Sequence, residues 1–126
     1  MSDLLADGAT WLEQQRHEHL SHAVTYWRAG ESLTLPATVG RTEWEENDEY
    51  GRVTRWESRD FLVRASDLSI GGVATLPSPG DRITESDDSG KRWTYEVLAP
   101  GGAAAFRYSD PGRVTIRIHT KLVESE

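Results

Sequence analysis

Apolar and polar residues alternate along residues 113–119, near the carboxyl end of the chain. A period of two is typical of a β-strand that buries one face and exposes the other. Turn-forming sequences at residues 79–81 and 110–112 separate the strands that are expected in the carboxyl-terminal half of the chain. The pattern predicts a small antiparallel sheet with one face in a core and one face in water. The alternating residues are Val114, Ile116 and Ile118 on the apolar face, against Thr115, Arg117 and His119 on the polar face.

From Ser21 onward the chain carries only strand signals. Pro36 cannot donate a ladder hydrogen bond, so the strand around it is expected to have a free edge there. Six or seven short antiparallel strands with regular turns predict a mainly β fold, a small barrel or sandwich over residues 21–123. The other expected strands cover residues 24–28, 32–41, 53–65, 82–85, 91–98 and 106–108.

The long strand expected at residues 53–65 changes character along its length. Val53 shares a face with Phe61 and Val63, but the positions of that face between them carry charged side chains. Two explanations remain open: a bulge near residues 58–60 resets the register, or the first part of the strand projects beyond the core. The interrupting charges are Arg55, Glu57 and Arg59.

Residues 1–20 are predicted to form one amphipathic helix. Ser2 is a suitable N-cap, and an apolar stripe runs opposite a polar face. The stripe either covers the open end of the chain's own sheet or packs against another subunit, and the two alternatives weigh equally. Its members are Leu4, Leu5, Trp11, Leu12 and Leu20.

Composition narrows the function classes. The chain has 126 residues, enough for one domain, and no cysteine for a disulfide or thiolate metal site. Its net charge is −7, and its 14 Lys and Arg are interleaved with 21 carboxylates. Nucleic-acid binding requires clustered cations, so tight DNA or RNA binding is not expected. No apolar run approaches the length of a membrane span, so no membrane association is expected.

One segment between two strands, residues 43–51, is expected to be an acidic loop. Its charge predicts either a solvated hairpin tip or a projecting functional loop. In the second case two aromatic residues, Trp44 and Tyr50, would serve as contacts, or the loop would line an acidic passage. The carboxylates are Glu43, Glu45, Glu46, Asp48 and Glu49.

Histidines are the only candidates for metal chemistry. Positions 17 and 19 point about 200° apart on a helix. His19 and His22 alone share a face, and two ligands from one segment do not make a site. His119 is expected on the surface. No nucleophile elbow or phosphate-binding glycine loop occurs, so no catalytic, metal or cofactor site is expected.

From about Val24 to Lys121 the order of signals is similar to that of a known family. The signals are the run 57–63 (ESRDFLV), the turn and strand 79–83 (PGDRI), the strand 95–97 (YEV) and the closing run 117–121 (RIHTK). The chain thereby resembles the small head–tail joining proteins of tailed bacteriophages, also called head-completion, neck or stopper proteins. That family has no catalytic residues to carry over.

The resemblance implies a virion protein, assembled in the host cytoplasm, whose partners are copies of itself. It implies a ring between the portal or adaptor and the tail proteins, through which DNA passes without sequence-specific binding. Five tryptophans and many arginines suit protein interfaces, and acidic residues facing a lumen would keep DNA from adhering. The interface candidates are Leu5, Trp11, Leu12, Trp44 and Tyr50.

A second class of function stays open. A soluble small barrel that binds a ligand or single-stranded nucleic acid would use aromatic rings as stacking platforms. Trp56, Trp93 and Tyr95 are the candidate rings. The absence of a basic groove argues against this alternative.

Overall fold

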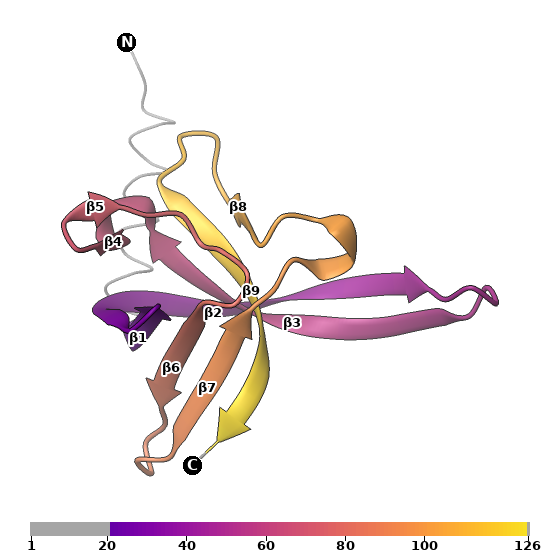
Figure 1. Cartoon of the computed structure of the whole chain (residues 1–126), viewed down its shortest axis with the longest axis horizontal. Coiled ribbons are helices and arrows are strands. Elements are labelled where there is room, and N and C mark those ends of the chain that lie inside the picture. The colour runs from indigo at the N-terminus through magenta and orange to yellow at the C-terminus, as the bar shows by residue number, and fades with distance from the viewer. Residues whose placement is uncertain (1–20, 126) are drawn as a thin grey trace.

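The structure is a computed structural model, and it describes residues 21–125 of the chain. The described part is mainly β, with two short 3-10 turns, η1 (Ala65–Asp67) and η2 (Pro100–Gly102) (Figure 1). The strands are β1 (His22–Arg28), β2 (Glu31–Asn47), β3 (Val53–Arg64), β4 (Ser69–Ile70), β5 (Val73–Ala74), β6 (Arg82–Ser86), β7 (Arg92–Val97), β8 (Phe106–Tyr108) and β9 (Thr115–Ser125).

The strand pairings are antiparallel and run in a closed circuit. The order is β3-β2-β1-β6-β7-β9-β8, and β3 also pairs with β9. Following the pairs from β1 therefore leads through β2, β3, β9, β7 and β6 back to β1. Strand β9 is paired along both of its edges. Residues 115–120 pair with β3 along one edge, and β8 and β7 pair with β9 along the other edge.

Side-chain alternation places one apolar cluster inside this circuit. On β3, Phe61 and Val63 point inward and pair with Ile118 and Ile116 of β9. All four are at most 1% exposed, and burial of each contributes roughly 1.5–3 kcal/mol. The full cluster is Val24, Tyr26, Leu35, Ala37, Phe61, Val63, Leu68, Ile83, Tyr95, Val97, Ala105, Ile116 and Ile118.

A tight turn joins β1 to β2. Arg28 pairs with Glu31, which leaves Ala29 and Gly30 as a two-residue loop with φ of 49° and 84°. Positive φ at both positions is the requirement of a type I′ turn, whose twist matches the flanking strands. Gly30 meets that requirement without strain, whereas Ala29 accepts a left-handed conformation.

The expected strands are confirmed, most of them with small shifts of their ends, but β2 continues past the expected end at residue 41 to Asn47 and β9 continues past residue 121 to Ser125. The expectation of a free edge at Pro36 agrees with the pairing, because β3 pairs with β2 only from Thr38 onward. The short β4–β5 hairpin was not predicted, since two-residue strands leave no alternation to detect. The helix expected over residues 1–20 lies outside the described residues.

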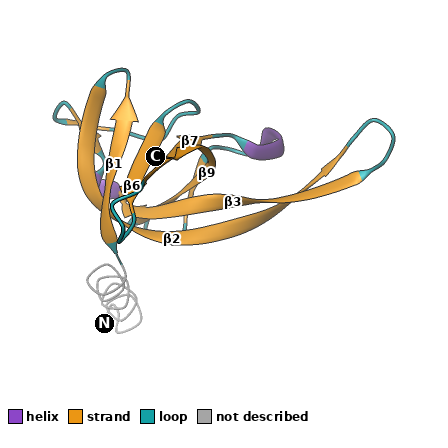
Figure 2. Ribbon diagram, turned by 90° about the horizontal axis from the view of Figure 1, so that it is seen from below, coloured by secondary structure: helices purple, strands orange, loops and turns teal. Residues whose placement is uncertain are grey.

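The two explanations for residues 53–65 are now distinguished. The register between β2 and β3 is continuous from Thr38↔Leu62 to Asn47↔Val53, so no bulge occurs at residues 58–60. Instead both strands continue past the body as a long hairpin (Figures 1 and 2). Residues 42–58, which extend beyond the last β3–β9 pair at Arg59, are called the arm.

Three expectations about side-chain environment and local structure were wrong. The acidic loop at 43–51 is largely strand, because residues 43–47 pair with 53–57 and only residues 48–52 form the turn. The polar face of the last strand is not in water, because Thr115 is fully buried and His119 is 3% exposed. Val114, expected on the core face, precedes β9 and is 43% exposed.

Candidate functional site

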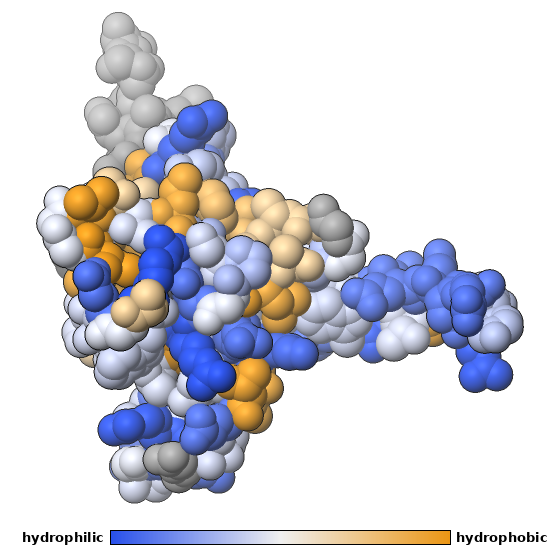
Figure 3. All heavy atoms as spheres, in the orientation of Figure 1, coloured by the Kyte–Doolittle hydropathy of each residue, from blue (hydrophilic) through white to orange (hydrophobic). Residues whose placement is uncertain are grey.

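The arm carries most of the residues singled out in the sequence. Its strands have two faces, and the face that continues the core side of β2 and β3 is charged. Glu43 lies opposite Glu57, and Glu45 lies opposite Arg55, with which it forms an ion pair of 3.0 Å. Figure 3 shows the arm as a largely hydrophilic projection from the body. Six carboxylates and two arginines make its net charge −4.

The opposite face of the arm is aromatic. Trp44 and Trp56 are cross-strand partners, and their rings stack with centroids 6.1 Å apart. The Trp44 indole N–H donates to Ser58 Oγ at 3.0 Å, and its ring meets His119 edge-on at 5.0 Å. Trp44 therefore joins the arm to the body while its ring stays partly exposed.

The arm ends in a turn organised by Asp48. One of its carboxylate oxygens accepts the backbone N–H groups of Tyr50 at 2.9 Å and Arg52 at 2.8 Å. Gly51 supplies the left-handed backbone with φ of 77°. This turn presents Tyr50, which is 82% exposed, at the far end of the arm. Asp48 is thus a structural residue, while Glu49 and Tyr50 are free for contacts.

A buried carboxylate, Asp60, lies where the arm meets the body. It points outward from β3, yet it is fully buried. Ser58 Oγ donates to it at 2.6 Å, and the Arg117 guanidinium does so at 2.7 Å. Thr42 also donates a hydroxyl hydrogen bond, and His119 Nδ1 lies 3.0 Å away. Burial raises the pKa of Asp60, but these hydrogen bonds outweigh it and hold that pKa far below the usual range.

Gly40 makes room for this cluster. It lies opposite Asp60 on β2, and a Cβ there would lie 3.2 Å from Arg117 Nη1. The absence of a side chain at Gly40 leaves room for the guanidinium next to β2, where it reaches the carboxylate. The cluster fixes the direction in which the arm leaves the body, because its members come from β2, β3 and β9.

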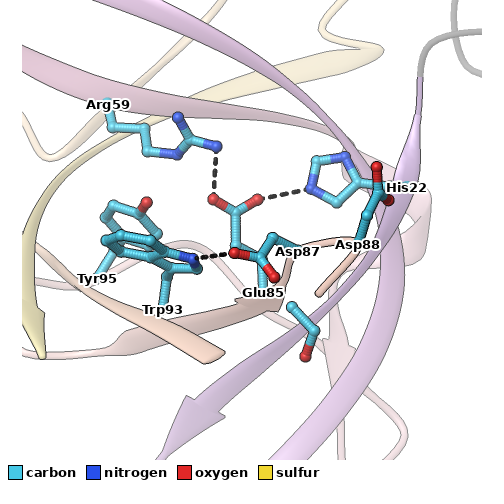
Figure 4. Close-up of a pocket in the computed structure, with 8 residues that line it drawn as sticks. His22, Arg59, Glu85, Asp87, Asp88, Trp93 and Tyr95 are labelled. Carbon is cyan, nitrogen blue, oxygen red and sulfur yellow. Dashed lines mark hydrogen bonds and ion pairs between the residues drawn. The ribbon is translucent and has the colours of Figure 1, made fainter. Parts of the chain in front are cut away.

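A second polar cluster closes one end of the core on the inward face (Figure 4). Glu85 is 8% exposed and lies between His22, whose Nε2 is 2.7 Å away, and Arg59. The Arg59 guanidinium also covers the Tyr95 ring at 5.1 Å. Beyond these residues a hollow of about 510 Å³ opens, with Asp87, Asp88 and Trp93 at its rim.

Two carboxylates of this hollow, Glu85 and Asp87, are engaged by neighbouring groups. The buried Glu85 carboxylate contacts His22 Nε2 and pairs with the Arg59 guanidinium, and Asp87 accepts hydrogen bonds from backbone N–H groups of its own turn and from Trp93 Nε1 at 3.1 Å. Hydrogen bonds from Ser89 and Trp93 lower the pKa of Asp87 to about 2.

The two histidines that the structure describes, His22 and His119, lie in different clusters. His22 belongs to the Glu85 cluster and His119 to the Asp60 cluster, so the expectation that His119 is a surface residue was wrong. Within residues 21–125 no group of three His, Asp or Glu side chains is arranged to hold a metal ion. His17 and His19 lie outside the described residues.

The aromatic platform needed for single-stranded nucleic acid does not form. Trp56 stacks on Trp44 in the arm, whereas Trp93 and Tyr95 lie at the end of the core. Tyr95 is 7% exposed and packs against Phe61, so its ring is not available to a base. The three candidate rings therefore belong to two separate places.

Sequence reasoning missed the burial of three carboxylates, Asp60, Asp81 and Glu85. Each depends on partners far along the chain, such as Arg117 for Asp60 and His22 for Glu85. The one signal was the polar run Ser58-Arg59-Asp60 inside a strand that must cross the core. The interface candidates Leu5, Trp11 and Leu12 lie outside the described residues.

No helix in the part of the chain that the structure describes is long and apolar enough to cross a membrane. A family profile described as phage head-tail joining protein matches residues 2–126. No curated protein matches the chain. The family match spans the body, the arm and nearly all of the first twenty residues.

Proposed function

Because the chain belongs to the phage head–tail joining protein family, which has a structural role in the virion at the junction of head and tail, we propose that it forms a homo-oligomeric ring at that junction. DNA passes through the ring without sequence-specific contacts. The neighbours of the ring are the portal or adaptor complex on one side and tail proteins on the other. No step of bond making is assigned to the protein, whose role is mechanical.

The observation that carries this proposal, beside the family match, is the arm. It projects from the body and gives nothing to the core (Figure 2). A long hairpin with an exposed tip costs chain entropy and presents unpaired strand edges, so it is retained where a partner uses it. A joining protein must bind its neighbours, and the arm is long enough to contact a neighbouring protein away from the body.

The closed circuit of strands supports the small barrel expected from the sequence. A barrel removes most sheet edges, so a ring subunit can expose chosen edges and hairpins without general aggregation. We assign the wall of this barrel to β1, β2, β3, β9, β7 and β6, with β8 added outside on β9.

The charge of the chain agrees with DNA passage. A net charge of −7 repels the phosphate backbone and would limit adhesion of DNA to a lumen wall. Leu5, Trp11 and Leu12 are proposed contacts within the assembly, either on the chain's own barrel or on the next subunit. The carboxylates of the arm face either the lumen or a partner.

Deletion of the gene from the phage tests the proposal. Filled heads and complete tails should then accumulate unjoined, as seen by negative-stain electron microscopy. Adding the purified full-length protein to an extract of such particles should restore joined, infectious phage. If heads and tails join and infect normally without the protein, the joining role is wrong.

A further inference from the structure

A shallow groove lies on the outer face of the body, across β1, β6, β7 and the end of β9. It holds about 300 Å³ and is lined by Trp27, Arg82, Thr84, Arg92, Thr94 and Glu124. Trp27 is 42% exposed, and its indole N–H is fixed by Thr84 Oγ1 at 2.5 Å. A large ring held in place at the surface is typical of a contact residue.

Two arginines stand over this groove without partners. Arg82 and Arg92 are both exposed, and neither guanidinium has a hydrogen bond or ion pair within residues 21–125. The arginines Arg28, Arg59 and Arg117, by contrast, each bind a buried carboxylate. Glu124 lines the same groove, so the groove has a net charge of +1.

The arm has the complementary chemistry. Its net charge is −4, and its described carboxylates form a single ion pair, between Glu45 and Arg55. Glu46 and Glu49 are exposed along the outer part of the arm, and Tyr50 is exposed in the turn at its end. A Cβ at Gly101 would lie 3.8 Å from Glu46 Oε1, so Glu46 is on the side of the arm that faces η2. Carboxylates suit arginine through paired N–H···O bonds, and a tyrosine ring suits an exposed tryptophan.

The arm and the groove lie on opposite walls of the strand circuit. β3 is three strands away from β6 in either direction, and β2 is three strands away from β7. The arm extends β2 and β3, whereas the groove lies over β6 and β7. A contact between two different surfaces of one chain is heterologous, and it closes into a ring when the rotation between copies allows.

We propose that the tip of the arm of one subunit docks in the Trp27 groove of the next copy, with Glu46 and Glu49 on Arg82 and Arg92 and Tyr50 against Trp27. This inference rests on the proposed ring and names the surfaces that hold it together. It also assigns the arm to a partner rather than to the lumen.

Charge reversal tests the contact in the full-length protein. One variant carries Arg82→Glu and Arg92→Glu, and a second carries Glu46→Arg and Glu49→Arg. All four sites are exposed, so circular dichroism and thermal unfolding should stay close to wild type. Each variant alone places like charges in the contact, and head–tail joining in the deletion extract should fall by about tenfold or more.

Combining the reversals separates a specific contact from general damage. The chain with all four substitutions should join heads and tails again, and an equal mixture of the two double variants should do the same. When the two variants alternate around a heterologous ring with an even number of subunits, the mixture restores opposite charges at every contact. A matched control, Arg64→Glu with Arg107→Glu, changes the charge equally on β3 and β8 and should join normally.

The outcomes distinguish the inference from the proposed function. If either double variant joins normally, or if the fourfold variant and the mixture fail, the docking contact is wrong. If the arm variant joins particles that then release DNA poorly, the arm faces the lumen, which overturns the docking but leaves the joining role intact. If the wild-type protein itself restores no joining, the proposed function fails.

Discussion

Strands β2 and β3 run through both the body and the arm, yet different interactions stabilise the two regions. In the body, one face of β2 and β3 carries Leu35, Ala37, Phe61 and Val63 into the core. In the arm, the same face carries charged side chains such as Glu43 and Glu57. The backbone pairing is unbroken between the two regions. The end of the body is therefore set by side-chain chemistry and not by the end of a strand.

The stabilising forces differ accordingly. The body is held by burial of a large apolar cluster, whereas the arm has only cross-strand pairs, each contributing roughly 0.2–1 kcal/mol. Asp60 and Trp44 connect the two regions through buried hydrogen bonds and ring contacts. Substitutions in the body should thus change stability, and substitutions in the arm should change assembly. Substitutions in the Asp60 cluster, where the arm meets the body, should change both.

The largest expected effect is on the core. Phe61→Ala removes a fully buried ring and leaves a cavity, so the free energy of unfolding should fall by about 3–5 kcal/mol. Trp56→Ala is the matched change in the arm, where the ring is only partly buried, and should cost about 1 kcal/mol or less. Urea unfolding measures both. Equal losses would show that the arm belongs to the folding core.

The next largest effect on stability is expected in the Asp60 cluster, where the arm meets the body. Asp60→Asn leaves the Arg117 guanidinium without its counter-charge in a mostly buried site, and should cost about 2–3 kcal/mol. Glu57→Gln is the control, since Glu57 is exposed on the neighbouring stretch of β3. Urea unfolding near neutral pH should separate the two variants. If Asp60→Asn lowers the free energy of unfolding no more than Glu57→Gln does, the Asp60 cluster does not stabilise the junction of arm and body.

Acid should weaken the same cluster. The pKa of Asp60 is lowered in the folded protein, so the unfolded chain binds the proton more readily. The stabilising contribution is therefore fully present above the unfolded pKa of about 4 and is lost as pH falls toward the folded value. Between about pH 5 and 2 the wild type should lose stability more steeply than Asp60→Asn. Parallel curves of unfolding free energy against pH would contradict this account.

The smallest effect on stability should come from shortening the arm. Replacing residues 45–55 by Asn-Gly leaves Trp44 and Trp56 as the last pair and gives the hairpin a favoured two-residue turn. The free energy of unfolding should change by about 1 kcal/mol or less, while head–tail joining is lost. Urea unfolding and the deletion extract measure the two quantities. Normal joining by the shortened chain would remove the arm from the assembly.

Much of the fold could be predicted from alternation alone. The runs that became β1, β3, β6, β7, β8 and the first half of β9 were placed within a few residues. The parity break between Val53 and Phe61 also marked the point where the strand leaves the core. Local sequence could not decide between a bulge and a projection, because both explain the same charged positions.

The sequence by itself determined the mainly β class, the alternating core positions along the strands, and the acidic, aromatic character of the arm. Only the tertiary structure decided that residues 43–47 are strand, that His119 is buried beside Asp60, and that Glu85 joins His22 to Arg59. Period-two alternation is a local property, readable from neighbouring residues. Partners of a buried charge are chosen by the pairing of distant strands, and nothing in the local pattern specifies which strands those are.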